Sequence, residues 1–74
     1  MGNKGGRNMN YYIAFVNEDG YDWCSVATND YDKIVEIYEL LCPPPGWEME
    51  LRVTEEDIDT HVHYEVLRST HNFM

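Results

Sequence analysis

The chain has 74 residues, of which 14 are acidic and 5 are basic, so its formal net charge is −9. This length allows one small domain, and a hydrophobic content of 43% is too high for a disordered acidic tail. The charge repels nucleic acid and anionic membranes and attracts basic protein surfaces, so we expect neither direct nucleic-acid binding nor membrane binding.

The first nine residues are polar, contain three glycines and lack any periodic apolar pattern. We therefore expect residues 1–9 to be a flexible N-terminal segment. This segment could be partly foreign to the natural protein, and Met9 could equally be the natural start. We expect one domain over residues 10–69 and a C-terminal tail over residues 70–74. Without Lys4 and Arg7, three basic residues stand against the same fourteen acidic ones, a balance of −11.

Two strand-like runs, residues 11–16 and 21–27, flank the sequence Asn-Glu-Asp-Gly. Asp-Gly between such runs predicts a β-hairpin. If Val16 lies opposite Tyr21, each face of the hairpin is apolar, and a one-residue slip would rearrange both faces. One face would carry Tyr11, Ile13, Phe15, Cys24 and Val26, and the other Tyr12, Ala14, Val16, Tyr21 and Trp23. One helix can cover only one of these faces.

Residues 30–42 are predicted to form a helix, with Asn29 or Asp30 as the N-cap. The apolar side chains recur with helical spacing on one side, and the acidic ones on the other. The proline run 43–45 must end the helix. The apolar side consists of Ile34, Ile37, Tyr38 and Leu41, and the acidic stripe of Asp32, Glu36 and Glu39.

Residues 47–54 alternate apolar and polar side chains, which predicts a half-buried antiparallel strand. An acidic turn over 55–59 leads to a last predicted strand, 60–68, with Val62, Tyr64 and Val66 facing inward. The order β-β-α-β-β indicates an α+β fold, a four-stranded antiparallel sheet with one helix on one face. We expect a core that contains Ile34, Ile37, Leu41, Leu51 and Val53.

No set of residues has the spacing of a catalytic or metal site. His61 and His63 would lie on one strand face and could share a metal with a third ligand, but a solvated sheet face is the simpler interpretation. The acidic run 55–59 lacks the glycine and spacing of a calcium loop. Cys24 and Cys42 match no metal or redox pattern, so we expect buried thiols. The sequence thus predicts no enzyme, no cofactor and no metal.

The acidic surface favours a small protein-binding module that acts stoichiometrically on a basic surface of a partner protein. Size and charge suggest an analogy with DNA mimics of phages or mobile elements, which inhibit nucleic-acid-handling host defence enzymes. The alternative is a structural module, a homodimer or a subunit of a larger assembly, whose charge serves solubility. No secretory signal or membrane span is visible, so we expect a cytoplasmic protein. The expected partner-binding residues are Glu48, Glu50, Glu55, Glu56, Asp57, Asp59 and Glu65, with Tyr21 and Trp23 as apolar anchors.

Overall fold

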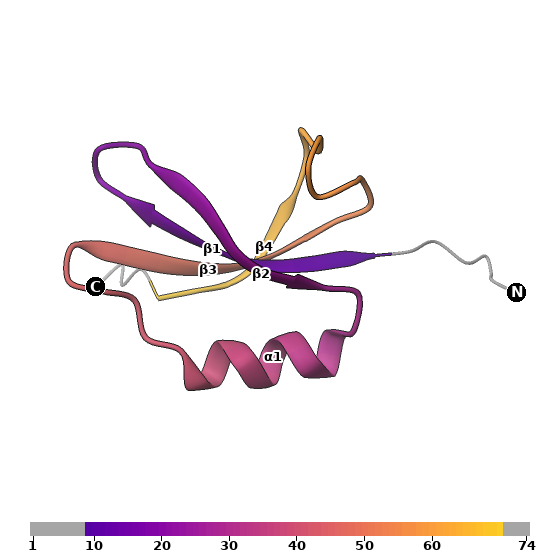
Figure 1. Ribbon diagram of the computed structural model, residues 1–74, viewed down its shortest axis with the longest axis horizontal. Coiled ribbons are helices and arrows are strands. Elements are labelled where there is room, and N and C mark those ends of the chain that lie inside the picture. Colours follow the sequence, from indigo (N-terminus) through magenta and orange to yellow (C-terminus); the bar gives the residue numbers. More distant parts are fainter. Residues whose placement is uncertain (1–8, 71–74) are drawn as a thin grey trace, which may run out of the picture.

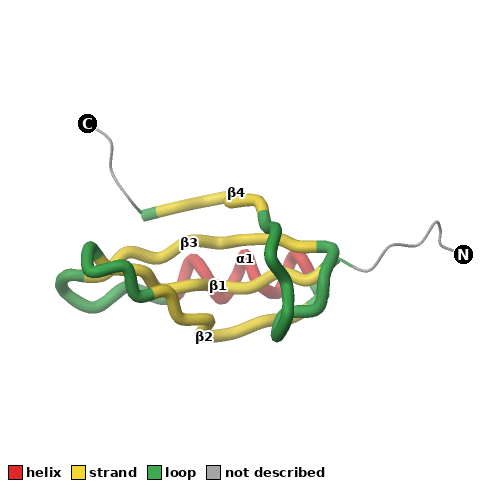
Figure 2. Tube along the Cα trace, turned by 90° about the horizontal axis from the view of Figure 1, so that it is seen from above, coloured by secondary structure: helices red, strands yellow, loops and turns green. Residues whose placement is uncertain are grey.

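The computed structural model describes residues 9–70. The segment expected at 1–9, apart from Met9, and the tail beyond Thr70 lie outside the described residues. The elements are β1 (Asn10–Asn17), β2 (Asp22–Thr28), α1 (Tyr31–Leu40), β3 (Trp47–Thr54) and β4 (Glu65–Ser69), as Figure 1 shows. All neighbouring strands are antiparallel, in the order β2-β1-β3-β4, and α1 lies on one face of the sheet (Figure 2). The predicted α+β fold, with its β-β-α-β-β order, is confirmed.

The β1–β2 hairpin differs from the predicted register by one residue or more. Tyr21 belongs to the turn, because its backbone N–H donates to Asn17 Oδ1 at 3.1 Å and its carbonyl accepts from the Asn17 N–H at 3.2 Å. Val16 therefore pairs with Asp22, and a β-bulge follows at Ser25. The Ser25 hydroxyl donates to the Ile13 carbonyl at 3.1 Å.

This register exchanges two side chains between the faces of the sheet. Trp23 lies beside Phe15 on the helix side, and Cys24 lies beside Ala14 on the side away from the helix. The predicted faces are wrong for both residues, because the turn extends through Tyr21 and shifts the pairing of β2 by one residue. The bulge at Ser25 then returns Val26 to the predicted face, opposite Ile13. Trp23 therefore lies on the opposite sheet face from Glu50.

Helix α1 begins as predicted and ends earlier. The Asp30 side chain accepts the Lys33 N–H at 3.2 Å, which satisfies one of the free amide groups of the first turn. The helix ends at Leu40, and Leu41 already has extended backbone angles of φ −89° and ψ 154°. Leu41 is 37% exposed, so its predicted place in the core is wrong. The extended geometry that the prolines require therefore starts two residues before Pro43.

The main core lies between α1 and the inner strands. Ile13, Ile34, Met49 and Leu51 are fully buried there. Val53 is 6% exposed and Ile37 is partly buried against the cluster, so the predicted core is confirmed for every member except Leu41.

The last strand is shorter than predicted and presents the opposite side chains to the helix. β4 starts at Glu65, and residues 60–64 form an irregular segment. Val66 pairs with Arg52 and Glu65 with Val53, so Val66 shares the sheet face of Arg52, which faces away from the helix. The prediction that Val62, Tyr64 and Val66 face the core under the helix is wrong. Val62, Tyr64 and Val66 are 77%, 46% and 45% exposed, because Tyr64 and Val66 lie on the Arg52 face, which α1 does not cover.

Candidate protein-interaction surface

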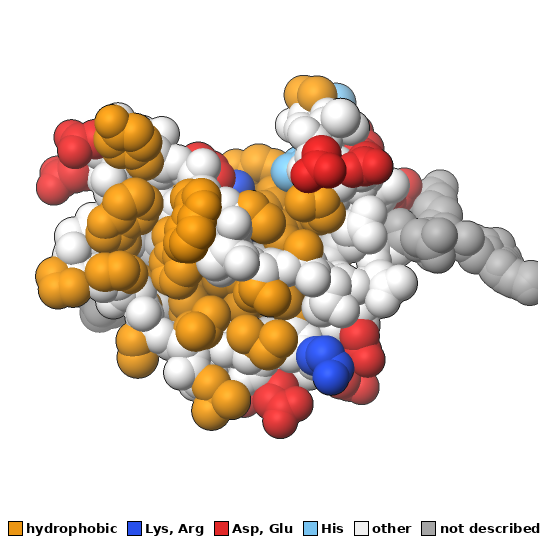
Figure 3. All heavy atoms as spheres, viewed as in Figure 1, with side chains coloured by type: hydrophobic (Ala, Val, Ile, Leu, Met, Phe, Trp, Pro, Cys, Tyr) orange, Lys and Arg blue, Asp and Glu red, His pale blue; other side chains and the backbone are white. Residues whose placement is uncertain are grey.

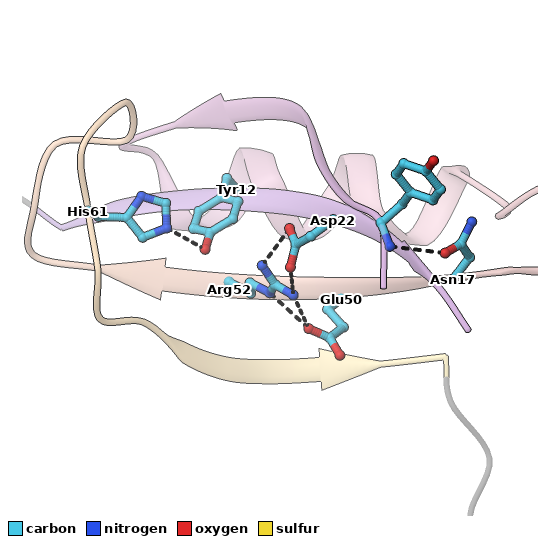
Figure 4. A network of polar contacts seen from close by, with 7 residues as sticks. Tyr12, Asn17, Asp22, Glu50, Arg52 and His61 are labelled. Carbon is cyan, nitrogen blue, oxygen red and sulfur yellow. Dashed lines mark hydrogen bonds and ion pairs between the residues drawn. The ribbon is translucent and has the colours of Figure 1, made fainter. Parts of the chain in front are cut away.

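A buried arginine organises the sheet face away from α1. Arg52, in β3, is 3% exposed, and its guanidinium forms a bidentate ion pair with Asp22 of β2, with distances of 3.1 and 2.9 Å (Figure 4). Its Nε and Nη2 atoms also contact Glu50 Oε1, at 2.8 and 2.7 Å. The Tyr64 ring lies 4.1 Å from the guanidinium carbon, within the range of a cation–π contact. The pair thus ties β3 to edge strand β2.

The positive charge of Arg52 is buried and paired, so it does not contribute to the surface of the protein. Burial alone would lower the pKa of Arg52, but hydrogen bonds to Asp22, Tyr12 and Glu50 hold it above its ordinary value. Arg52 therefore stays charged, and its charge is neutralised inside the molecule. Arg68 also has a carboxylate partner, Glu39, at 3.3 Å. Because only three basic residues occur in 9–70, little positive charge remains to offset the acidic surface.

Residues 55–64 fold back over the same sheet face. The Tyr12 hydroxyl, on a side chain that is 1% exposed, lies 2.7 Å from His61 Nε2, and His61 Nδ1 lies 2.8 Å from the Ile58 carbonyl. Because a carbonyl can only accept, Nδ1 donates, and in the neutral imidazole Nε2 then accepts from the Tyr12 hydroxyl. The Thr54 hydroxyl donates to the His63 carbonyl at 2.7 Å. The apolar face that the helix leaves uncovered is thus covered partly by the chain itself.

Glu56 holds this loop together through its carboxylate. Oε1 accepts the Val62 N–H at 2.7 Å, and Oε2 lies 3.1 Å from His63 Nδ1. The hydrogen bond from Val62, and then that from His63, lower the pKa of Glu56. The Asn10 side chain donates to the Glu56 carbonyl at 2.7 Å, which ties the loop to the start of β1. The role of Glu56 in the described structure is therefore to shape the loop.

Three of the predicted partner-binding residues line one hollow. Its volume is about 260 Å³, and we call it the acidic hollow. Glu55 and Glu56 come from the loop after β3, and Glu65 from the start of β4, so the pairing of β4 with β3 brings them together. The lining consists of Met9, Val53, Thr54, Glu55, Glu56, His63, Tyr64 and Glu65.

The other predicted residues do not join this hollow. Glu50 is bound to Arg52, and the Asp57 side chain accepts the Asp59 N–H at 3.0 Å within its own exposed turn. Glu48 lines a separate hollow near the β1–β2 turn. Figure 3 shows acidic side chains on both projections that rise above the sheet, with the surface hollowed between them. The predicted binding residues therefore lie in three places: Glu48 near the β1–β2 turn, the acidic hollow and its loop at the opposite end of β3, and Glu50 between them beside Arg52.

An aromatic site near the β1–β2 turn was missed by the sequence analysis. Phe15, Trp23, Pro44 and Trp47 line a hollow of about 240 Å³, which we call the aromatic hollow. The Phe15 and Trp23 rings stack with their centroids 5.7 Å apart. Trp23 faces this side because the turn extends through Tyr21, and the sequence Asn-Glu-Asp-Gly-Tyr does not by itself distinguish this longer turn from the predicted one. Pro-Gly-Trp at 45–47, where the chain enters β3, is a signal in the sequence for an ordered aromatic residue there.

No three histidine, cysteine, aspartate or glutamate side chains within 9–70 are placed to bind one metal ion. Both cysteines are exposed rather than buried as predicted, and burial of part of the Cys24 side chain raises its thiol pKa, which disfavours the reactive thiolate. No helix in this part of the chain is long and apolar enough to cross a membrane.

Comparison with protein-family models, curated proteins and solved structures finds no match for this chain.

Proposed function

We propose that this protein is a stoichiometric protein-binding module whose acidic surface binds a basic surface of a partner. The observation that carries the proposal is the acidic hollow, in which Glu55, Glu56 and Glu65 line an open space together with Tyr64. A lysine or arginine side chain fits such a site chemically, because carboxylates accept its hydrogen bonds and an aromatic ring attracts its charge.

The charge of the whole chain supports the same function. A net charge of −9 on 74 residues exceeds the magnitude of about 2 to 8 that solubility requires of a small domain. The pairing of Arg52 with Asp22 and Glu50 keeps its positive charge off the surface. The remaining field attracts a basic partner over a Debye length of about 8 Å at physiological salt and raises the association rate.

A nucleic-acid-handling enzyme is the partner class that we favour. Such enzymes carry basic channels, and a compact acidic domain can occupy one in place of the phosphate backbone. In this form the protein is an inhibitor of the DNA-mimic type, and host defence enzymes blocked by phages or mobile elements are the instance suggested by size and charge. Competition between the protein and duplex DNA for the captured partner tests this form.

The test compares two double charge reversals that change the net charge equally. Glu55→Lys with Glu65→Lys alters the acidic hollow, whereas Asp32→Lys with Glu36→Lys alters the exposed stripe of α1. Each protein is used to capture partners from a host lysate at low and high salt, and binding to the purified partner is then measured. We expect the first pair to weaken binding at least tenfold and to flatten its salt dependence, and the second pair to change it less than threefold. Equal binding by both variants and the parent would refute the proposal.

A second function, a homo-oligomeric structural module, is favoured by the exposed side of edge strand β2. Trp23 in β2 and Tyr21 in the turn before it are 60% and 66% exposed, and an edge strand has backbone groups that can pair with another copy. Sedimentation across a hundredfold range of protein concentration tests this function. A concentration-dependent dimer that binds no basic partner would support it in place of the first.

A further inference from the structure

The aromatic hollow is an apolar site that the molecule leaves open. Trp23 stacks on Phe15 with one face of its ring, and 60% of the residue still contacts solvent. Figure 3 shows that hydrophobic side chains gather in this region, between the β1–β2 turn and the C-terminal end of α1. Aromatic side chains that remain exposed around a hollow are typical of interface anchors.

The walls of the hollow are held in place before any partner binds. Pro44 lies in the stiff segment 43–45, and the Trp47 N–H donates to the Pro44 carbonyl at 3.0 Å in a tight turn. Gly46 has a φ of +85°, which this turn requires and which glycine adopts without strain. Trp47 then enters β3, where it pairs with Asn17 of β1. A preformed apolar site loses little conformational entropy on binding.

A second hollow, which shares Trp47 with the aromatic hollow, carries negative charge. Trp47 also lines the neighbouring hollow, which contains Glu18 from the β1–β2 turn and Glu48 from β3. The volume of the aromatic hollow, about 240 Å³, is below the roughly 300 to 1,000 Å³ of sites for small molecules. It therefore suits one bulky side chain of a protein segment.

We propose that the aromatic hollow binds a bulky apolar side chain of a partner protein, and that Glu18 and Glu48 bind a lysine or arginine next to it in the partner sequence. This inference rests on the proposed function and adds the apolar contact that fixes where the basic partner docks. Charge complementarity selects this occupant over a second copy of the chain. A symmetric pair would bring Glu18, Glu48 and two net charges of −9 together, which repel.

The chain contains a natural reporter for this test. Its two tryptophans are Trp23 and Trp47, and both line the hollow, so intrinsic tryptophan fluorescence and the indole NMR signals report on this site. The probes are three acetylated and amidated peptides, Ser-Arg-Leu-Arg-Ser, Ser-Arg-Ala-Arg-Ser and Ser-Glu-Leu-Glu-Ser. We expect the first to shift the emission to shorter wavelength and to perturb both indoles, and to bind at least tenfold more tightly than each of the others.

Variants assign the effect to the hollow. Trp23→Ala should remove the response of the Trp47 indole to the first peptide, Trp23→Phe should keep most of it, and an amide NMR spectrum checks that each variant is folded. Glu18→Gln with Glu48→Gln should weaken binding and reduce its salt dependence. Equal binding of the leucine and alanine peptides would overturn the inference, and so would indole signals that change with protein concentration alone, which indicate a second copy in the hollow.

The captured partner separates this inference from the proposed function. We expect Trp23→Ala and the Glu55→Lys, Glu65→Lys pair each to weaken partner binding at least tenfold. If the charge reversals weakened partner binding but Trp23→Ala did not, the further inference alone would be overturned. Loss with Trp23→Ala but not with the charge reversals would refute the proposed acidic hollow and leave the aromatic contact standing.

Discussion

Replacing Arg52 by glutamine tests whether the sheet face away from α1 is a second buried layer. Arg52→Gln removes both ion pairs and the contact with the Tyr64 ring. Removing one partner of a buried pair costs about 3 to 5 kcal/mol. The Asp22 side chain is 50% exposed and can recover water, so we expect a loss of about 2 to 4 kcal/mol in the free energy of unfolding.

Thermal and urea denaturation followed by circular dichroism measure this loss. In a domain of this size, 1 kcal/mol shifts the melting temperature by about 4 to 8 °C, so a decrease of roughly 8 to 30 °C is expected. Arg68→Gln is the matched control, because it changes the net charge equally and breaks only an exposed pair with Glu39, which contributes at most about 1 kcal/mol. If the two variants melted within about 2 °C of each other, the reasoning about a buried second layer would be refuted.

Three further predictions concern the core, the loop and metals. Leu51→Ala, at a side chain with no exposure, should lower the free energy of unfolding by about 2 to 5 kcal/mol, while Leu40→Ala, at 79% exposure, should change it by less than about 0.5 kcal/mol; urea denaturation measures both. The amide signal of Val62 should titrate with Glu56, at a midpoint below the ordinary glutamate pKa. Because the pKa of Glu56 is lowered in the folded protein, the hydrogen bond from Val62 is fully formed above the ordinary glutamate pKa and is lost as the pH falls through the lowered pKa. The control is Glu56→Gln, in which the Val62 amide signal should show no such pH-dependent change. Chelator should leave the melting temperature unchanged, since both ring nitrogens of His61 have hydrogen-bond partners within the chain; a large decrease with EDTA would contradict this.

The elements that the sequence predicted well depend on local signals. The alternation over 47–54 matches β3, and Asp30 is the N-cap of α1. These features are set by side-chain period and by hydrogen bonds to residues a few positions away, so a single segment contains the information. The fold class follows from the order of such segments.

The errors arise where distant residues decide the outcome. The bulge at Ser25 depends on how β2 fits against β1, and nothing in 21–27 alone distinguishes it from a regular strand. Val66 faces away from the helix because β4 pairs with β3 in a register that places Val66 opposite Arg52, and the segment 60–68 alone does not reveal that register. Arg52 looked like a solvated residue of an alternating strand, since its carboxylate partner Asp22 is thirty positions away. The sequence predicts that the candidate site is acidic. It does not predict that Glu55, Glu56 and Glu65 line one hollow while Glu48 lines another.

The position of α1 over only part of the sheet divides the stability of the domain unevenly. α1 packs against β1 and β2, whereas β4 is an edge strand paired to β3 and linked to α1 by the exposed Arg68–Glu39 pair. Native-state hydrogen exchange should therefore identify residues 55–69 as a separate unit that opens at lower free energy than the helix-covered core. Five of the eight residues that line the acidic hollow belong to this unit, so the hollow is lost when the unit opens and forms again when it closes; these residues are Glu55, Glu56, His63, Tyr64 and Glu65. A partner that binds only the closed form will slow exchange throughout 55–69 and leave the amides of α1 unaffected.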